Sequence, residues 1–250
     1  MDVQKYLDRI QFSKNLICTD EVLKSIHQLH VHQIPFENLD IYYKKIFNLD
    51  IESVFKKVVI NNRGGFCYEL NLLFDWLLNS IGFTSRIISA RIFNDDGTLG
   101  PQFDHMCVYV KTNSDFLVDV GFGDLFVLPL EIKNGVQFDG RNYFQIEKLE
   151  KNDFLLSMSA DGIDFKKKYI FNLEFVNAKD FESICFDKQT NPSSYFVQNV
   201  ICTKPTKTGR ITIFNNKFIE KITDSRFETP INDNEEMKIF LKEKFRIEIN

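Results

Sequence analysis

The spacing of the apolar residues changes at about residue 83, and this change constrains the fold more than any other feature. Before it, segments such as TDEVLKSIHQL and FCYELNLLFDWLL repeat apolar residues with the period of an amphipathic helix. After it, short runs such as HMCVYVK and FLVDVGFG are rich in β-branched and aromatic residues, and turn-like NDDGTLGP and TNSD separate them. The chain is therefore predicted to be α+β, with helices first and an antiparallel sheet or barrel over residues from about 84 to 185.

Polar residues and glycines at the ends of the predicted helices agree with this division. Thr19 and Asp50 each precede a helical pattern, where a short polar side chain accepts hydrogen bonds from the first N–H groups. Gly82 follows the pattern that starts after Gly65 and is predicted to end that helix. Farther along, GRITIFNNKFIEKI is predicted to form a hairpin and NDNEEMKIFLKEKF a terminal helix. Without an internal repeat or low-complexity linker, the parts are expected to share a core.

Length, charge and hydropathy narrow the classes of function. The 250 residues are enough for a substantial core. A net charge of −4 without a long basic run argues against a nucleic-acid partner. No stretch approaches the roughly 18 apolar residues of a membrane span, and the start MDVQKYLDRIQF lacks the apolar segment of a secretory signal. Neither a membrane nor a nucleic acid is therefore expected as a partner.

The cysteines and histidines predict neither a disulfide framework nor a metal site. An odd number of cysteines without a CxxC pair suggests reduced thiols and a cytoplasmic location. His27, His30 and His32 recur closely, but histidines on a helix pack or cap more often than they bind a metal. The five cysteines are Cys18, Cys67, Cys107, Cys185 and Cys202.

Cys67 occupies the position best suited to thiol chemistry. It follows an Arg-Gly-Gly turn and opens a long helical pattern. A thiol attacks only as a thiolate, and the N-terminal end of a helix lowers the thiol pKa through its free N–H groups and its macrodipole. Gly64 and Gly65 would allow a tight turn and the close approach of a substrate. The alternative is a buried structural cysteine, which Cys67 taken alone favours.

A nucleophilic thiol also needs a base and a group that orients the base, and His105 and Asp119 can supply them. His105 starts HMCVYVK and Asp119 lies near the end of FLVDVGFG, so a hairpin turning at residues 112–115 would bring them together. The carboxylate would then fix the second nitrogen of the imidazole. Taken singly, Asp119 could cap a turn and His105 could be an ordinary strand-edge histidine. With Cys67 they have the order and topology of papain-like thiol chemistry.

Four segments resemble, in order, the signature segments of the arylamine N-acetyltransferases: HVHQIPFENLD, RGGFCYELN, DHM and DVGFGD. NPSSYFVQN and TKTG extend the resemblance more loosely into the second half. The resemblance implies a helical lobe over 1–83, a β-barrel lobe over 84–190 and a small C-terminal α/β lobe over 191–250, around a cysteine-protease-like core. It also implies that Cys67 is the acylated nucleophile, His105 the base and Asp119 the orienting carboxylate.

In that family, acetyl-CoA donates an acetyl group to arylamines or arylhydrazines. The resemblance implies a ping-pong acetyltransferase with an acetyl-cysteine intermediate and no metal. It places Thr206 and Gly209 of TKTG near coenzyme A, and Phe122 is expected either to line the acceptor pocket or to pack in the core. Where the family usually has a small residue before the histidine, this chain has bulky Phe103 and charged Asp104. Because that segment borders the acceptor cleft in the family, Phe103 is expected there.

Two other functions fit the same residues. A thiol hydrolase or transglutaminase-like enzyme has the same Cys-His-Asp order, although RGGFCYELN and IPFENLD fit the transferase pattern better. A family member could also bind coenzyme A or aromatic ligands without catalysis. The presence of all three reactive residue types argues against that reading.

Overall fold

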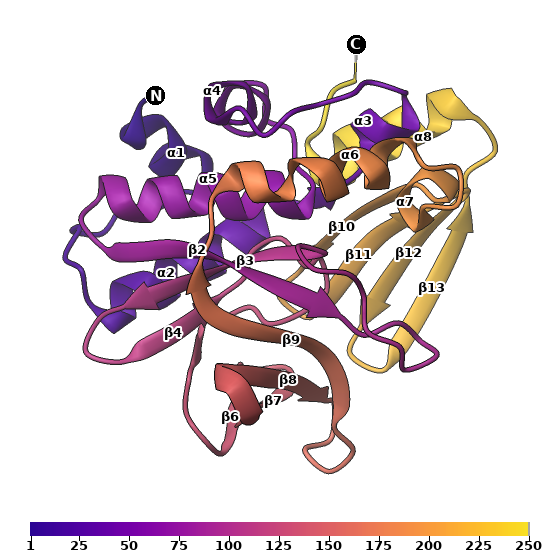
Figure 1. Cartoon of the computed structure of the whole chain (residues 1–250). Coiled ribbons are helices and arrows are strands. Elements are labelled where there is room, and N and C mark those ends of the chain that lie inside the picture. The colour runs from indigo at the N-terminus through magenta and orange to yellow at the C-terminus, as the bar shows by residue number, and fades with distance from the viewer. Residues whose placement is uncertain (250) are drawn as a thin grey trace.

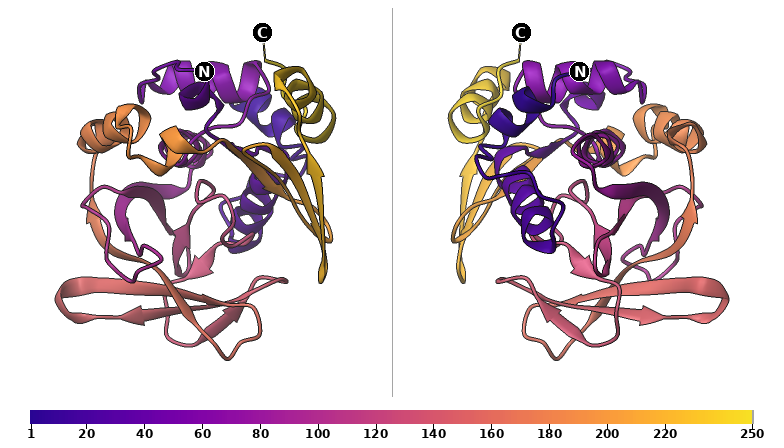
Figure 2. Two further views of the ribbon diagram at one scale, coloured as in Figure 1. Left: turned by 90° about the vertical axis from the view of Figure 1, so that its right-hand side faces the viewer. Right: turned by 90° about the vertical axis from the view of Figure 1, so that its left-hand side faces the viewer.

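Two antiparallel sheets and the helices packed against them make up the structure, a computed structural model that describes residues 1–249 (Figure 1). Helices α1 (Val3–Arg9), α4 (Ile51–Phe55) and α5 (Cys67–Ser80) lie at the top of this view, with the larger sheet below them and the smaller sheet at the right. Figure 2 shows both chain ends on one side of the molecule, opposite the hairpin of β7 (Tyr143–Lys148) and β8 (Asp153–Ser159).

The helices begin and end where local chemistry predicts. The side chains of Thr19 and Asp50 accept hydrogen bonds from backbone N–H groups of the helices that follow them. Gly82 has a φ of +99°, a conformation that glycine adopts readily, just beyond the end of α5. The other helical segments are α2 (Asp20–Gln33), α3 (Leu39–Tyr42), a π-helical turn Lys56–Ile60, a 3-10 turn Glu150–Asn152, a 3-10 turn Ala178–Phe181, α6 (Glu182–Thr190), α7 (Tyr195–Gln198), α8 (Asn234–Phe240) and a second π-helical turn Leu241–Phe245.

The larger sheet has eight antiparallel strands in the order β5-β4-β3-β2-β9-β8-β7-β6. The side chain of Gln137 in β6 bonds both to the N–H and to the carbonyl of Glu131 in β5 at 2.8 Å, which links the two edge strands. The predicted sheet or barrel is confirmed, but its last strand ends at Phe175. Residues 182–190 form α6 instead, and this helix buries Cys185. The remaining strands are β2 (Thr84–Ile92), β3 (His105–Lys111), β4 (Asp115–Val118), β5 (Leu130–Glu131), β6 (Val136–Phe138) and β9 (Lys166–Phe175).

The smaller sheet has the order β1-β10-β11-β12-β13 and joins the two ends of the chain. The predicted hairpin is formed by β11 and β12, and the predicted terminal helix α8 packs over one face of the sheet. β1 comes from the N-terminal region, and Asn38 beside it accepts a hydrogen bond from Ile201 N at 2.7 Å. The α+β fold is confirmed; the division into three lobes stays a prediction. The strands are β1 (Phe36–Glu37), β10 (Ile201–Pro205), β11 (Gly209–Phe214), β12 (Lys217–Ile222) and β13 (Ser225–Pro230).

Helix α5 connects the fold to the candidate site. It packs against β2 and β3, and its residues from Cys67 to Phe74 are all buried. A helix that is apolar on most sides is stable only inside a core, so its first residue is held firmly between the sheets. Within residues 1–249, the helices are too short or too polar to cross a membrane.

Candidate active site

Cys67 is the first residue of α5, and close packing within the chain builds the turn before it. A Cβ on Gly64 would overlap the carbonyl oxygen of Pro35, so only glycine fits there. Glu69 accepts a hydrogen bond from the backbone N–H of Phe66 at 2.8 Å, which satisfies one of the free donors at the helix start. At Gly64 the close approach is therefore to the protein's own backbone.

A network of ion pairs braces the same turn. Lys57 Nζ lies 2.8 Å from Glu69 Oε2 and 2.7 Å from Asp40 Oδ2. Arg63 pairs with Glu37 at 2.8 Å and with Asp40 at 3.0 Å. Burial lowers the pKa of Lys57, but the neighbouring carboxylates outweigh burial and raise it overall. These contacts fix the helix start and engage Arg63 inside the protein.

His105 and Asp119 meet as the predicted hairpin requires. β3 starts at His105, and its pairing with β4 runs from Lys111↔Asp115 to Val108↔Val118. His105 Nε2 then lies 2.7 Å from Asp119 Oδ2, and both side chains are buried. The contact orients the imidazole and leaves its other nitrogen for a different partner.

Asp119 is held by three further donors. Its Oδ1 accepts from Asn71 Nδ2 at 2.9 Å and from Gly121 N at 3.0 Å, and the Tyr169 hydroxyl lies 3.3 Å from Oδ2. Burial raises the pKa of Asp119, but His105 and the hydrogen bonds lower it below its ordinary value overall. Sequence reasoning missed these partners. Asn71 had a signal, because it lies four residues after the cysteine on the same helix face, whereas Tyr169 had none.

A cavity of about 460 Å³ opens beside these groups. Cys67 and His105 both line it, so the structure brings the candidate nucleophile and base to one space. Phe122 also lines it, and its ring meets the His105 ring edge-on with centroids 5.3 Å apart. The aromatic residues Tyr195 and Phe196 lie on the lining as well. A mostly aromatic and aliphatic surface of this kind suits a planar aromatic ligand.

An ion pair that the sequence did not predict lies on the same lining. Lys188 Nζ of α6 is 2.6 Å from Asp104 Oδ1, and both side chains are largely buried. Lys188 Nζ also lies over the Phe196 ring, 5.5 Å from its centroid. Asp104, which departs from the resembled pattern, thus holds a cation beside the cysteine.

The surroundings of Cys67 act on its thiol in opposite directions. Burial raises the pKa of the Cys67 thiol well above its ordinary value, and the charge of Lys188 works against this. This direction is opposite to the lowered pKa that the helix start alone predicts. The reason is that the first residue of α5 is enclosed by the sheets rather than exposed to water.

Three further residues that the resemblance places near the ligands make contacts within the protein. Phe103 packs its ring against Phe181, with centroids 5.3 Å apart, and is not among the residues that line the 460 Å³ cavity in the described chain. Thr206 and Gly209 form the turn between β10 and β11, where Thr206 N donates to Gly209 O at 2.9 Å. Arg141 donates to both of their carbonyl oxygens, at 2.8 Å for Gly209. Their backbone acceptors are therefore already engaged within the protein.

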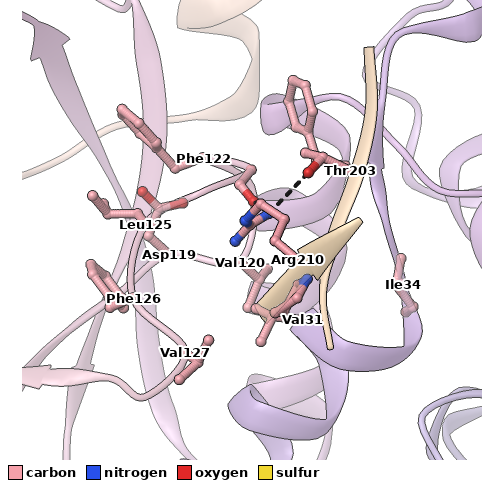
Figure 3. Close-up of a pocket in the computed structure, with 13 residues that line it drawn as sticks. Val31, Ile34, Asp119, Val120, Phe122, Leu125, Phe126, Val127, Thr203 and Arg210 are labelled. Carbon is pink, nitrogen blue, oxygen red and sulfur yellow. Dashed lines mark hydrogen bonds between the residues drawn. The ribbon is translucent and has the colours of Figure 1, made fainter. Parts of the chain in front are cut away.

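Arg210 of β11 and Phe122 line the same small pocket (Figure 3). Its Nη1 donates to Gly123 O and, at 3.0 Å, to Thr203 Oγ1. Burial lowers the pKa of Arg210 to about 10. A small void of about 20 Å³ beside it is large enough for about one water. Arg210 lines the large cavity too, so it connects the smaller sheet with the loop that carries Phe122.

The clustered histidines pack as expected. His30 Nδ1 bonds to the Tyr6 hydroxyl at 2.7 Å, and His27 Nδ1 lies 3.1 Å from Val127 O. Across residues 1–249, no group of three or more His, Cys, Asp or Glu side chains is arranged to hold a metal ion.

Comparisons with known proteins identify the family of this chain. A family model described as N-acetyltransferase matches residues 19–250. Arylamine N-acetyltransferase, pineal gland isozyme NAT-10, of Gallus gallus is 29% identical, and the alignment covers 99% of this chain and 94% of that protein.

Solved structures extend the likeness to three dimensions. Arylamine N-acetyltransferase from M. tuberculosis superposes with a TM-score of 0.90 at 26% identity, covering 98% of this chain and 94% of that one. The Mycobacterium marinum enzyme, solved in complex with CoA, superposes with a TM-score of 0.89 at 24% identity, covering 98% and 93%. The chain therefore belongs to the arylamine N-acetyltransferase family and is an acyltransferase.

Proposed function

We propose that Cys67 carries an acetyl group from acetyl-CoA to the nitrogen of an arylamine or arylhydrazine, with His105 as the base and Asp119 as the group that orients it. One observation above all supports this assignment. His105 Nε2 lies 2.7 Å from Asp119 Oδ2 beside a cavity that Cys67 also lines. The CoA bound in the M. marinum relative supports coenzyme A as the carrier of the donor group.

The first half-reaction transfers the acetyl group to sulfur. Because burial raises the pKa of the Cys67 thiol, the thiol needs a base to ionise. It gives its proton to Nδ1 of His105, while Nε2 keeps its hydrogen and donates it to Asp119. The thiolate attacks the thioester carbonyl, and the bond from that carbon to the sulfur of CoA breaks. CoA leaves as a thiol with the proton from His105. The Cys67 N–H, at the helix start, is the donor we assign to the oxyanion.

The second half-reaction returns the enzyme to its starting state. An arylamine is weakly basic and therefore neutral near pH 7, so its nitrogen lone pair can attack the acetyl-cysteine carbonyl. His105 accepts the proton of the amine as the amide forms and returns a proton to the departing sulfur of Cys67. The aromatic lining around Phe122 would hold the ring of the acceptor.

Intact-mass spectrometry after incubation with acetyl-CoA tests the intermediate. The wild-type protein should gain one acetyl group, and Cys67→Ser should gain none. Cys18→Ser, which changes an exposed free cysteine, is the matched control and should be acetylated like the wild type. An acetyl group that persists in Cys67→Ser would contradict the assignment.

A thiol hydrolase would release CoA at a rate that does not depend on the amine. CoA release is therefore measured with and without an aromatic amine or hydrazine. The transferase predicts amine-dependent release and an acetylated product. Amine-independent release with no acetylated amine would favour the hydrolase.

Two broader predictions accompany this function. The division into lobes at 1–83, 84–190 and 191–250 is proposed as a folding subdivision, although β1 crosses it. The cytoplasmic location is also proposed, and the free state of all five cysteines agrees with it.

A further inference from the structure

Strand β13 is the longest open sheet edge among residues 1–249. The other edge strands, β1, β5 and β6, have two or three residues, and Gln137 links β5 to β6. β13 has six residues, all of them exposed, and Figure 1 shows it as the outermost strand at the right of the molecule. An exposed edge strand offers unpaired backbone N–H and carbonyl groups to another strand.

The pairing with β12 shows which backbone groups of β13 face outward. Just beyond the strand, Ile231 N donates to Asn216 O at 2.8 Å. Residues that bond to the neighbouring strand alternate along an antiparallel ladder, so Thr229 and every second residue before it face β12. The backbone groups of Arg226 and Glu228 therefore face away from the sheet. Neither of their N–H groups donates to a side chain or to another strand in the part of the chain that the structure describes.

A second copy of this chain matches these outward groups. Two antiparallel β13 strands related by a two-fold axis at Phe227 place Arg226 directly opposite Glu228 of the partner subunit. Both residues face outward, so each of the two symmetric pairs can exchange two backbone hydrogen bonds. Phe227 is 57% exposed and would meet the partner's Phe227 at the centre, in the non-hydrogen-bonded pair where side chains lie closest.

The charges of β13 favour this register over its neighbours. Moving the two-fold axis to Arg226 or to Glu228 would place like charges directly opposite each other, which is destabilising. With the axis at Phe227, opposite charges face each other in both pairs. Charged residues commonly protect an edge strand from pairing. Charges of one sign would repel a second copy, whereas β13 carries a cation on one side of Phe227 and a carboxylate on the other.

Within one chain, these charges are paired only at the surface. Arg226 pairs with Glu228 at 2.5 Å, and Lys217 pairs with the same carboxylate at 2.8 Å. The two cationic side chains are about half exposed, and exposed ion pairs contribute little to stability. A partner across the edge can therefore replace the internal one at small cost. Because Arg226 also lines the 460 Å³ cavity, Glu228 of the partner subunit would lie beside the cavity lining.

We propose that β13 is a self-complementary docking strand, through which two copies of the chain join their five-stranded sheets into one continuous antiparallel sheet. A contact of one six-residue strand is smaller than the roughly 1,200 Å² of a stable interface. The dimer is therefore weak and is half formed at roughly 10 to 100 µM. It does not depend on the proposed function, because it uses the sheet edge rather than the reacting groups.

Sedimentation equilibrium from about 1 to 500 µM tests the dimer. With rising concentration, the wild type should change from the 29.4 kDa of one chain toward twice that mass. Arg226→Glu and Glu228→Arg should each stay monomeric over this range, because like charges then face each other in both pairs. An equimolar mixture of the two variants should dimerise again, because a strand with two carboxylates then meets a strand with two cations.

Lys166→Glu is the matched control. Lys166 is exposed on β9, so this variant changes the net charge as Arg226→Glu does and should leave the dissociation constant of the dimer within about twofold. Glu228→Pro approaches the contact through the backbone. It removes an outward N–H that β12 does not use, so circular dichroism should show an intact fold while the dimer is lost.

Amide hydrogen exchange locates the contact. Exchange at Arg226 and Glu228 should slow about threefold or more between dilute and concentrated protein, whereas exchange at Phe227, which already faces β12, should not change. A single monomeric species at every concentration would overturn the proposal and leave the edge to a strand of another protein. A dimer that persists in both charge variants would overturn it too, since the contact would then lie elsewhere.

Discussion

The two walls of the cavity differ in whether their polar side chains have partners within the protein. The wall that carries Cys67, His105 and Asp119 buries all three side chains, and His105 and Asp119 have hydrogen-bond partners within the protein. Asp119 alone accepts hydrogen bonds from three elements. We call this the reacting wall. The sheet wall, made by Arg210, Lys221 and Arg226, lines the cavity with cations of which two have no carboxylate partner in the described chain.

This difference separates two requirements of a group-transfer enzyme. Groups that act on developing charge work best when they are already oriented in a site that excludes water. Groups that bind a charged ligand must instead leave their charge available until the ligand arrives. The following predictions test whether the reacting wall depends on internal pairing as strongly as its contacts indicate.

Asp119→Asn should have the largest effect. The amide would bring an NH2 or a weaker acceptor to His105 Nε2 and disturb the tautomer that the carboxylate fixes, so kcat/KM should fall roughly 10³- to 10⁴-fold. Asp115→Asn, at the other end of β4, is the control and should stay within a few-fold of the wild type. A comparable loss in both variants would mean that the effect comes from the hairpin rather than from the imidazole.

Lys57→Met tests the ion-pair network that holds the start of α5. Glu69 and Asp40 would lose their buried partner, and the free energy of unfolding should fall by about 4 kcal/mol. Urea unfolding at pH 7 measures this, with Lys166→Met as an exposed control. If the variant loses less than about 1 kcal/mol, the network contributes as little as a surface ion pair would.

His27 and His30 are an exception to internal pairing, since the Nε2 atoms of both are buried without a hydrogen-bond partner among the described residues. Burial lowers the pKa of His27 to about 4, below that of an unfolded histidine. The unfolded state therefore takes up a proton first as the pH falls. Stability is complete above about pH 6.5 and declines from there toward pH 4, by about 2 kcal/mol between pH 6.5 and 5 for His27 alone.

Denaturant unfolding at a series of pH values checks this decline. In His27→Phe, which keeps an aromatic ring in the stack with Phe126, the slope over the same interval should be smaller. An equal slope in both proteins would show that His27 does not titrate in the way its burial implies.

Lys188→Gln should have the smallest effect, because Asp104 already offsets the charge of this lysine. Groups facing Cys67 include His105, Asp119, Asp104, Lys188 and Cys185. Removing the cation should raise the apparent pKa for alkylation of Cys67 and lower its rate at pH 7 about fivefold, or roughly 1 kcal/mol. Asp104→Asn should shift the pKa the other way. Shifts of the same sign in both variants would point to a packing effect instead.

The alkylation profile of the wild type also decides between two influences on the thiol. Sequence reasoning predicted a lowered pKa from the helix start, whereas burial raises it. If the apparent pKa for the reaction of Cys67 with iodoacetamide is well below the pKa of a free thiol, roughly 8.5, the proton has moved to His105.

The sequence predicts well those parts of the protein whose structure depends on residues that are close together in the chain. The caps at Thr19 and Asp50, the end of α5 before Gly82 and the hairpin that joins His105 to Asp119 each depend on residues a few positions apart. Strand β13 was not predicted. Every residue of β13 is exposed, so its sequence has no alternation of apolar and polar residues that would indicate a strand.

What a side chain touches across the fold was decided only by tertiary structure. The resemblance places Phe103 at the acceptor cleft and Thr206 near the donor, and both stay predictions. Sequence did not show that Phe103 packs on Phe181 or that Arg141 holds the turn of Thr206. It gave no sign that Lys188 would lie beside Cys67 or that three cations would align across β11, β12 and β13. Backbone propensity acts over a few residues, whereas strand register and burial bring together side chains that are distant in the chain.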